Sequence, residues 1–490
     1  MCHYNVEANK GLLSLNKRLN WCDQSATIGH KEIKSLAEWY SFKATEVYEY
    51  NYKRTGSVKE SCLSIRMYVR KLGLNDHFPK NWLNKTEEEV LALVKRFFDE
   101  RWWRRSINKY LKEIVESVLR DMGVVRKQVC PYISQYGFHK YKQGRIRNDQ
   151  MIDAMMLLAD DEEAIPLRQA VDASVSNPEI QRAELMVRLS GIEDIAKEDG
   201  LVPLFITLTC PSKYHARIGR SGRSNPKYQG YTPKDGQQYL NKVNSEIRAD
   251  LGKRGIKMAG FRIAEPHHDG TPHYHFLIYV KSEFSDLTAQ IFQKHALKED
   301  GLEEGADKYR CDVKQLDLEN GSATGYIAKY IAKNIDGTGV DTDYETGEQG
   351  DSSSLRVKAW ASIWRIRQFQ AIGSTPQTVY REFRRLPEAL TEKYPKQAEQ
   401  ARRAADEGNY AEYIRANGGL FVGRKELPFR AMHLLKEKAS KYGEDIQKII
   451  GIVVNTGHSI VTRTKDYTLV PNWMLDTQKA ARPPTLEYCQ

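Results

Sequence analysis

The sequence has no Cys-x-x-Cys pair and no apolar run long enough to cross a bilayer. Its seven cysteines are scattered from Cys2 to Cys489, which excludes a zinc finger of paired cysteines and is typical of a reducing compartment. Apolar stretches such as residues 449–454 are far shorter than the roughly 20 residues that a membrane-spanning helix needs. No secretory segment follows Met1. We therefore expect no membrane insertion.

Positive charge exceeds negative charge in this chain. Its 490 residues include 75 Lys and Arg against 64 Asp and Glu, which gives a formal net charge of +11 and a pI near 9.0. This balance favours a polyanionic partner, and charge alone fits a nucleic acid and an acidic membrane surface equally. The chain is too long for one compact core, so two or three domains are expected.

Residues 257–265 and 273–280 have the composition of two strands separated by a turn. The second run is almost wholly apolar after its histidines. The connection contains residues that favour turns, namely Pro266, Asp269, Gly270 and Pro272. The pattern predicts an antiparallel hairpin. His267 and His268 fall in its turn, where we expect exposed polar residues.

Three potential metal ligands are predicted to converge at the neck of this hairpin. Because side chains alternate across a strand, His273 and His275 share one face while Tyr274 takes the other. Pairing brings Glu265, at the end of the incoming strand, close to the histidines. Two imidazoles and a carboxylate suit a catalytic divalent ion, and the carboxylate favours Mg²⁺ or Mn²⁺. His-x-His alone is a weak signal, because alternating histidines are often core or surface residues.

A second group of candidates lies on one predicted helix, residues 322–334. Tyr326 and Tyr330 are four residues apart, which stacks their side chains one turn above the other. Tyrosines at this spacing often serve only to pack a helix against a core. Lys329 and Lys333 each follow a tyrosine by three residues, close enough to lower a phenol pKa or hold a phosphate. Both lysines also fit the simpler interpretation of solvated helix charges.

The order of these motifs resembles that of the HUH endonucleases. An apolar strand, Phe205-Ile-Thr-Leu-Thr209, precedes an acidic residue with His-x-His, and Tyr-x-x-x-Tyr follows on a helix. Asp269-Gly-Thr-Pro-His-Tyr-His275 and Trp360-Ala-Ser-Ile-Trp-Arg-Ile-Arg-Gln-Phe369 resemble the two-tyrosine class, the phage replication gene A proteins that initiate rolling-circle DNA synthesis. The resemblance spans roughly residues 200–375, and the ordered combination is far more specific than any single motif.

This resemblance implies a role for each candidate. His273 and His275 match metal ligands, and Glu265 matches the third ligand. Tyr326 and Tyr330 match the nucleophiles. Such enzymes nick single-stranded DNA at an origin, keep the 5′ phosphate as a phosphotyrosine ester and leave a free 3′ hydroxyl for a polymerase. The second tyrosine then cuts after one round, and the strand is rejoined into a circle.

The partners implied are single-stranded origin DNA, a host helicase and a host polymerase. The sequence has no G-x-x-x-x-G-K-[ST] phosphate loop, so unwinding must come from another protein. Rejoining needs no nucleotide, because a phosphotyrosine ester conserves the energy of the phosphodiester. We expect the protein to act in the cytoplasm of a bacterial host. Lys329 is the first choice for a cation that supports the reaction, and Lys333 is the second.

Two other functions fit the same residues. A relaxase or transposase of the same superfamily would use the same metal and tyrosines to mobilise a plasmid or satellite element. A basic DNA-binding regulator would use Glu265, His273 and His275 to hold a structural ion and would cut nothing. Covalent attachment to DNA separates the enzymes from the regulator.

The predicted fold class is α+β. A nuclease domain over residues 196–375 has a central antiparallel sheet that carries the metal, with the tyrosine helix laid against it. A helical domain over residues 1–150 precedes it, followed by connecting helices over residues 151–195. Residues 376–490 are predicted to be mainly helical.

Basic segments outside the motifs are candidates for DNA contact. Aromatic and basic side chains interleave in Arg101-Trp-Trp-Arg-Arg105 and in residues 137–147, which suits phosphate contact and base stacking. Trp102 and Trp103 also fit as core anchors. The basic loop over residues 217–236 either orders on DNA or is a plain exposed insertion.

Two segments follow the tyrosine helix. Residues 337–354 are polar, acidic and rich in Gly and Ser, which predicts a flexible excursion. Residues 355–372 return to helical periodicity, with Trp360, Trp364 and Phe369 as expected core residues.

Overall fold

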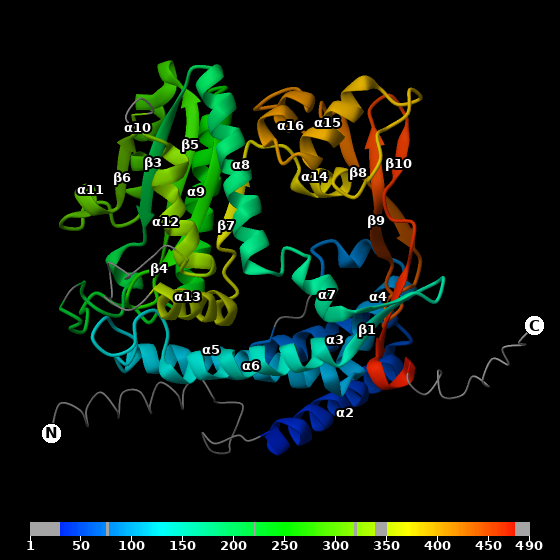
Figure 1. Cartoon of the computed structure of the whole chain (residues 1–490). Coiled ribbons are helices and arrows are strands. Elements are labelled where there is room, and N and C mark those ends of the chain that lie inside the picture. Colours follow the sequence, from blue (N-terminus) through cyan, green and yellow to red (C-terminus); the bar gives the residue numbers. More distant parts are fainter. Residues whose placement is uncertain (1–29, 75–77, 220, 318–320, 339–349, 476–490) are drawn as a thin grey trace, which may run out of the picture. The chain divides into compact units, whose positions relative to one another are not determined.

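The chain folds into two compact units, shown in Figure 1 as a computed structural model. The structure describes residues 30–74, 78–219, 221–317, 321–338 and 350–475. The first unit is formed by Met1–Val124 with His433–Ile449, and the second by Val125–Met432 with Ile450–Gln490. The division after Val124 assigns α6 (Gln135–Asp153) to the second unit, whereas the sequence predicts that most of this segment belongs to the N-terminal helical domain.

Helices form the described N-terminal part of the first unit, as predicted. Thr86 begins α4 with a capping box, in which its hydroxyl accepts from the Glu89 amide and the Glu89 carboxylate accepts from the Thr86 amide. These bonds satisfy backbone groups that a helix start leaves open. The elements are α2 (His30–Thr55), α3 (Val58–Lys71), α4 (Glu87–Lys95) and α5 (Glu100–Asp121), with 3₁₀ turns at Trp82–Asn84 and Arg96–Phe98.

The paired tryptophans of α5 belong to the core of the first unit. Trp102 and Trp103 are both buried. Trp103 Nε1 donates to the Phe97 carbonyl at 2.7 Å, and its ring stacks on Tyr40 with 5.2 Å between centroids. The interpretation of the two indoles as core anchors is therefore confirmed, and neither is available to stack on a base.

Trp103→Ala is expected to lower the free energy of unfolding of the first unit by about 3–5 kcal/mol, because it empties the space of a fully buried indole. Trp39 in α2 is 49% exposed, so Trp39→Ala is a matched control with an expected loss of about 1 kcal/mol or less. Urea unfolding followed by circular dichroism measures both. Equal losses for the two variants would contradict the central position of Trp103.

A five-stranded antiparallel sheet forms the centre of the second unit, as predicted for residues 196–375. Its strand order is β6-β3-β5-β4-β7, and every neighbouring pair is antiparallel. The predicted hairpin is β4 with β5, and both strands are buried along nearly their whole length. The strands are β3 (Leu201–Thr209), β4 (Ala259–Pro266), β5 (Pro272–Lys281), β6 (Cys311–Gln315) and β7 (Phe369–Ile372).

Helices cover both faces of this sheet (Figure 1). Because side chains alternate along a strand, Leu277 and Tyr279 of β5 enter one core, while Tyr274 and Phe276 enter the other. The first core includes residues of α8 (Pro178–Glu198) and α12 (Ala323–Ile335). The second includes residues of α9 (Pro233–Lys253), α10 (Ser285–Ala296) and α13 (Gly350–Trp364), and the four-residue helix α11 (Ala306–Tyr309) precedes β6.

Asp269 and Gly270 fix the turn between β4 and β5. Gly270 has a φ of +80°, a conformation that favours glycine. The Asp269 carboxylate accepts from the Thr271 amide at 3.0 Å and from the Ala216 amide at 2.9 Å. Trp360 of α13 donates from Nε1 to the Gly270 carbonyl at 2.8 Å. The hairpin is thus tied both to the loop after β3 and to α13.

The helix predicted over residues 355–372 is shorter than expected. It ends at Trp364, because Arg365 adopts a left-handed φ of +56° that an α-helix excludes. Phe369 then begins β7, which pairs with β4. Trp360 and Trp364 are buried as predicted, and Phe369 is partly buried. The predicted excursion over residues 337–354 lies mostly outside the described residues.

The prediction of a mainly helical region over residues 376–490 is wrong for its second half. Strand β9 is rich in Ile and Val, which favour strands, but a short apolar run cannot be distinguished from a helix by periodicity. The region contains α14 (Gln377–Phe383), α15 (Lys396–Asp406), α16 (Tyr410–Ala416), β8 (Phe429–Lys436), β9 (Ile446–Val454), β10 (Ser459–Val461) and β11 (Tyr467–Pro471). The first three strands form one sheet in the order β10-β9-β8.

Residues 151–195 contain two strands besides the predicted connecting helices. β1 (Met155–Ala159) pairs with β2 (Ala164–Pro166) and with β11, and α7 (Leu167–Asp172) and α8 follow. The pairing of β1 with β11 joins segments that are distant in sequence, so local patterns do not reveal it. Among the helices of the described residues, none combines the length and hydropathy of a membrane span.

Candidate active site

The three predicted metal ligands come together on the face of the sheet that carries α12. Glu265 lies directly opposite His273 in the register of the hairpin. The Nε2 atoms of His273 and His275 are 2.9 Å apart, and a Glu265 carboxylate oxygen lies 3.7 Å from His275 Nε2. The ligand atoms of the three residues all lie within 4.8 Å of one another, and all three side chains are buried.

Burial keeps both imidazoles neutral. Desolvation lowers the pKa of His275 to about 3, and the charges of Lys333 and Lys329 add to this shift. The pKa of His273 also lies well below its usual range, first because of burial and then because of neighbouring histidines and Lys333. A neutral imidazole has the lone pair that a metal ligand needs. Two such nitrogens with a carboxylate oxygen therefore fit a divalent cation.

Residues of three other segments hold these ligands. Thr207 of β3 lies opposite His275 and places its Oγ1 3.1 Å from His275 Nδ1. Asn334 of α12 donates from Nδ2 to a Glu265 oxygen, and its own side-chain oxygen accepts from Gln368 Nε2 at 2.8 Å. Contacts of this kind orient a ligand and leave its other donor atom for the ion.

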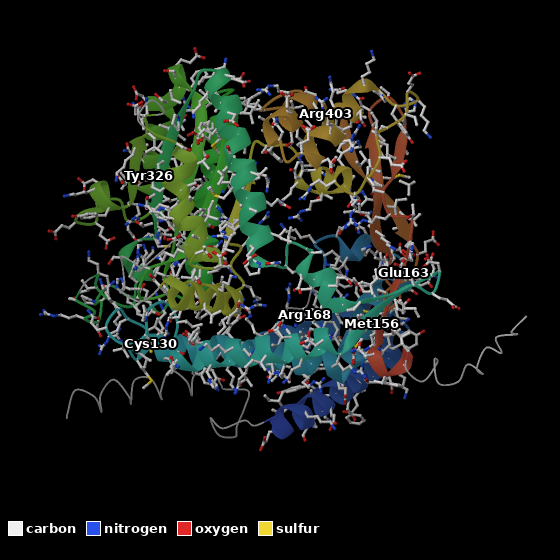
Figure 2. All side chains as sticks on the ribbon, in the orientation of Figure 1. Cys130, Met156, Glu163, Arg168, Tyr326 and Arg403 are labelled. Atoms are coloured by element: carbon white, nitrogen blue, oxygen red, sulfur yellow. The ribbon has the colours of Figure 1, made fainter. Side chains whose placement is uncertain are left out.

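The two tyrosines lie on α12, where Figure 2 labels Tyr326. Tyr330 is buried, and its ring centroid is 4.5 Å from that of His275. Tyr326 is partly buried, with its ring 6.4 Å from that of Tyr330. Both rings contact Phe205, at 4.8 Å for Tyr326 and 5.5 Å for Tyr330. The tyrosines thus contribute to packing and also lie beside the histidine cluster.

The two lysines of α12 occupy different environments. Lys329 is exposed, and its Nζ lies 5.0 Å and 5.2 Å from the ring centroids of Tyr326 and Tyr330. Lys333 is buried, with its Nζ 3.9 Å from a Glu265 oxygen. Lys329 is therefore the cation beside the phenols, whereas Lys333 is the cation beside the carboxylate. The interpretation as a solvated helix charge does not fit Lys333.

The prediction that His267 and His268 are exposed is wrong, because both are partly buried. The ring of His267 lies 4.1 Å from that of His273 and 5.1 Å from that of His215. Burial lowers the pKa of His267 well below its usual range. The loop after β3 is tied to the turn through Asp269 and brings His215 against His267, a contact that the composition of the turn does not reveal.

A comparison with protein families agrees with the motifs on this face. The family described as "Bacteriophage replication gene A protein (GPA)" matches residues 30–338, which is more than half of the chain and includes every candidate residue. The chain belongs to the bacteriophage replication gene A family. The predicted resemblance to this family is therefore confirmed.

The curated relatives of this member of the gene A family come from phages and prophage regions. The "Replication gene A protein" of Escherichia phage 186 is 38% identical over 462 residues, which cover 91% of the chain and 63% of the relative. That of Escherichia phage P2 is 35% identical over 402 residues, covering 79% and 53%. A "Probable replication endonuclease from prophage-like region" of Salmonella paratyphi A is 34% identical over 379 residues, covering 74% and 47%.

The chain spans about half to two thirds of the length of these relatives. No solved structure matches it.

Two residues beside the ligands were not predicted, although their spacing carries a signal. Asn334 follows Tyr330 by four residues, so it lies on the same face of α12 as Tyr326 and Tyr330. Thr207 follows Phe205 by two residues, so both lie on the same face of β3. Their roles depend on pairing between distant segments, which one sequence does not show.

Proposed function

We propose that this chain is a metal-dependent nickase and strand transferase that cuts single-stranded DNA at a replication origin through a 5′-phosphotyrosine intermediate. The observation that carries the proposal is the position of Tyr330 beside a buried cluster of two histidines and one carboxylate. The ring centroids of Tyr330 and His275 are 4.5 Å apart. Membership of the gene A family supports it, as does the description of the Salmonella relative as a probable replication endonuclease. The reaction would start and end rolling-circle replication.

The donor set of Glu265, His273 and His275 fits Mg²⁺ or Mn²⁺. Such an ion supplies Lewis-acid polarisation of a phosphate oxygen. The protein contributes the buried position, the neutral imidazoles, and the orientation of His275 by Thr207 and of Glu265 by Asn334. An ion held by these residues would stabilise the negative charge that develops on the phosphate.

The cleavage step assigns the nucleophile to a phenol oxygen of α12. A bond forms between that oxygen and phosphorus, and the bond from phosphorus to the 3′ oxygen breaks. The phenol loses one proton and the departing 3′ oxygen gains one, so the strand ends in a free hydroxyl. A phenol with a pKa near 10 needs help to react, and Lys329 is the cation placed above both rings.

The pair of tyrosines accounts for a second transfer. After one round of synthesis, the second phenol attacks the regenerated origin, and the free 3′ hydroxyl then attacks the first phosphotyrosine. Each step exchanges one phosphodiester for another, so the circle closes without a nucleotide. A host helicase would unwind the duplex and a host polymerase would extend the 3′ hydroxyl.

The test uses overlapping single-stranded DNA fragments that together cover the genetic element that encodes this protein. Each fragment is incubated with the protein and Mn²⁺. A protein–DNA product that survives SDS, with the nucleotide on Tyr326 or Tyr330 by mass spectrometry, supports the proposal. Cut DNA without an adduct indicates a hydrolytic nuclease and overturns it. Retarded native migration without any cut indicates the DNA-binding regulator.

Asn334→Leu is expected to reduce the affinity for Mn²⁺ by about 10- to 100-fold, because Glu265 loses the donor that orients its carboxylate. Titration calorimetry measures this without DNA. Asn455→Leu, at an exposed turn position, is the matched control and should bind as the wild type does. Unchanged affinity in Asn334→Leu, with the fold intact, would show that Asn334 has no role in positioning the ligand.

A further inference from the structure

A cavity of about 800 Å³ lies beside the histidine cluster in the second unit. Its lining comes from the end of β3, from the loop after β3, from the β4–β5 turn and from residues 303–312. Thr207 and His267 belong both to this lining and to the surroundings of the ligands, through the contacts of Thr207 with His275 and of His267 with His273. The cavity therefore adjoins the residues that surround the proposed metal ligands.

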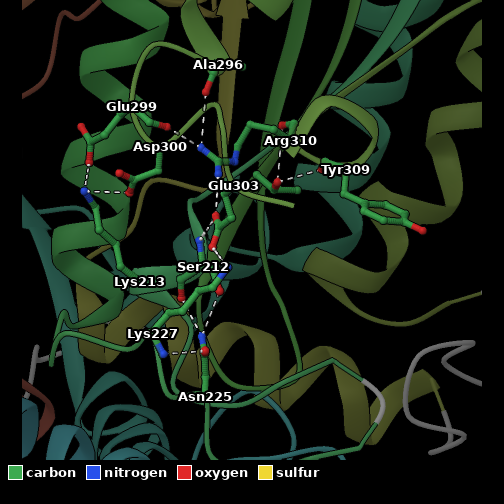
Figure 3. Close-up of polar contacts among 11 residues, drawn as sticks. Ser212, Lys213, Asn225, Lys227, Ala296, Glu299, Asp300, Glu303, Tyr309 and Arg310 are labelled. Carbon is green, nitrogen blue, oxygen red and sulfur yellow. Dashed lines mark hydrogen bonds and ion pairs between the residues drawn. The ribbon is translucent and has the colours of Figure 1, made fainter. Parts of the chain in front are cut away.

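One carboxylate holds the walls of the cavity together, as Figure 3 shows. Glu303 accepts from the Ser212 amide at 3.2 Å, from Lys227 Nζ at 2.9 Å and from the Arg310 guanidinium at 3.0 Å. Arg310 is 3% exposed and also donates to the Glu299 carbonyl at 2.9 Å. These bonds join the loop after β3 to the segment before β6.

The side chain of Tyr309 remains available on the rim of this cavity. It is 68% exposed, and in Figure 3 its ring points away from the Arg310 network. Lys308 Nζ lies 5.3 Å from the ring centroid. An exposed aromatic ring beside a cation is the combination on which nucleobases stack and phosphates are neutralised. A volume of this size also lies within the range of ligand pockets.

The position of the cavity relative to the tyrosines indicates which part of the DNA strand the cavity binds. Residues of α12 are absent from its described lining. In phosphoryl transfer, the attacking and leaving oxygens lie roughly in line on opposite sides of phosphorus. A phenol attacking from α12 therefore directs the leaving 3′ oxygen away from α12. Thr207 and His267, which line the cavity, are the other neighbours of the two histidines.

We propose that this cavity binds the nucleotides on the 5′ side of the cut, which end in the free 3′ hydroxyl, and that Tyr309 stacks on one of their bases. This inference rests on the proposed function. It gives the departing strand a binding site that does not depend on the covalent bond. The 3′ end would stay close enough to be extended or rejoined.

The test compares two oligonucleotides derived from the mapped cut site. The upstream one ends in the 3′ hydroxyl and the downstream one begins with the 5′ phosphate. Tyr309→Ala is expected to weaken binding of the upstream oligonucleotide by about 5- to 100-fold, measured by fluorescence anisotropy, and to leave the downstream one unchanged. Tyr309→Phe keeps the ring and should restore binding. Tyr50→Ala, at a position that is 69% exposed in the first unit, is the matched control.

The outcomes distinguish the two proposals. A wild-type protein that forms no adduct overturns the proposed function, and the assignment of the cavity fails with it. An adduct together with unchanged upstream binding in Tyr309→Ala overturns the assignment of the cavity alone. Weaker binding of the downstream oligonucleotide only would place the other half of the strand there and would also overturn it.

Discussion

The Tyr326→Phe/Tyr330→Phe variant is expected to form no covalent product with DNA and to keep its fold. The change removes two oxygens and leaves both rings, so the contacts with Phe205 and His275 persist. Without a phenol oxygen, no phosphotyrosine ester can form. An SDS gel with labelled DNA should therefore show loss of the adduct to below the detection limit, while the thermal unfolding curve stays close to that of the wild type.

The single variants separate the two phenols. Tyr330→Phe is expected to reduce the initial rate of adduct formation more than Tyr326→Phe, because the Tyr330 ring is in direct contact with His275. Tyr50→Phe, at an exposed position outside the site, serves as the matched control. An adduct in the double variant at the wild-type level would show that another side chain is the nucleophile.

The His273→Ala/His275→Ala variant is expected to lose cleavage by about 10²- to 10⁴-fold, since a Lewis-acid ion contributes several kcal/mol to the transition state. It should also show no saturable binding of Mn²⁺ in titration calorimetry. Both losses have one cause, the removal of two of the three donors that lie within 4.8 Å of one another. In the wild type, a chelator should abolish cleavage and added Mn²⁺ should restore it.

His458→Ala removes an exposed imidazole far along the chain and serves as the matched control. Since His273 and His275 are buried, circular dichroism must show that the double variant is folded. A folded variant that still binds Mn²⁺ and forms the adduct at the wild-type rate would show that the cluster is a packing feature. A folded variant that binds Mn²⁺ weakly but cuts DNA at the wild-type rate would show that cleavage does not need an ion at this site.

The local part of the site could be predicted because two short patterns determine it. Alternation along β5 puts His273 and His275 on one face, and the turn residues set the pairing that brings Glu265 opposite His273. The spacing of Tyr326 and Tyr330 sets their common face on α12 in the same way. These statements need only the geometry of a strand, a turn and a helix.

The contacts between distant segments could not be predicted from one sequence. Thr207 reaches His275 only because β3 pairs with β5, and Gln368 reaches Asn334 only because the chain returns to the sheet near β7. The same limit applies to the burial of His267 under the loop after β3 and to the pairing of β1 with β11. Each depends on a tertiary arrangement that local periodicity does not encode.

The short turn between β4 and β5 leaves the protein almost no freedom to change its length at this point. If the turn keeps its geometry and β5 slips by one residue, deleting or inserting one residue between Gly270 and His273 would send both imidazoles into the opposite core, where Tyr274 and Phe276 now pack. A change of two residues would return them to the correct side but shift them along the strand by about 7 Å, beyond the reach of Glu265. Variation among functional forms of this protein should therefore accumulate in its other loops and spare the spacing of these few residues.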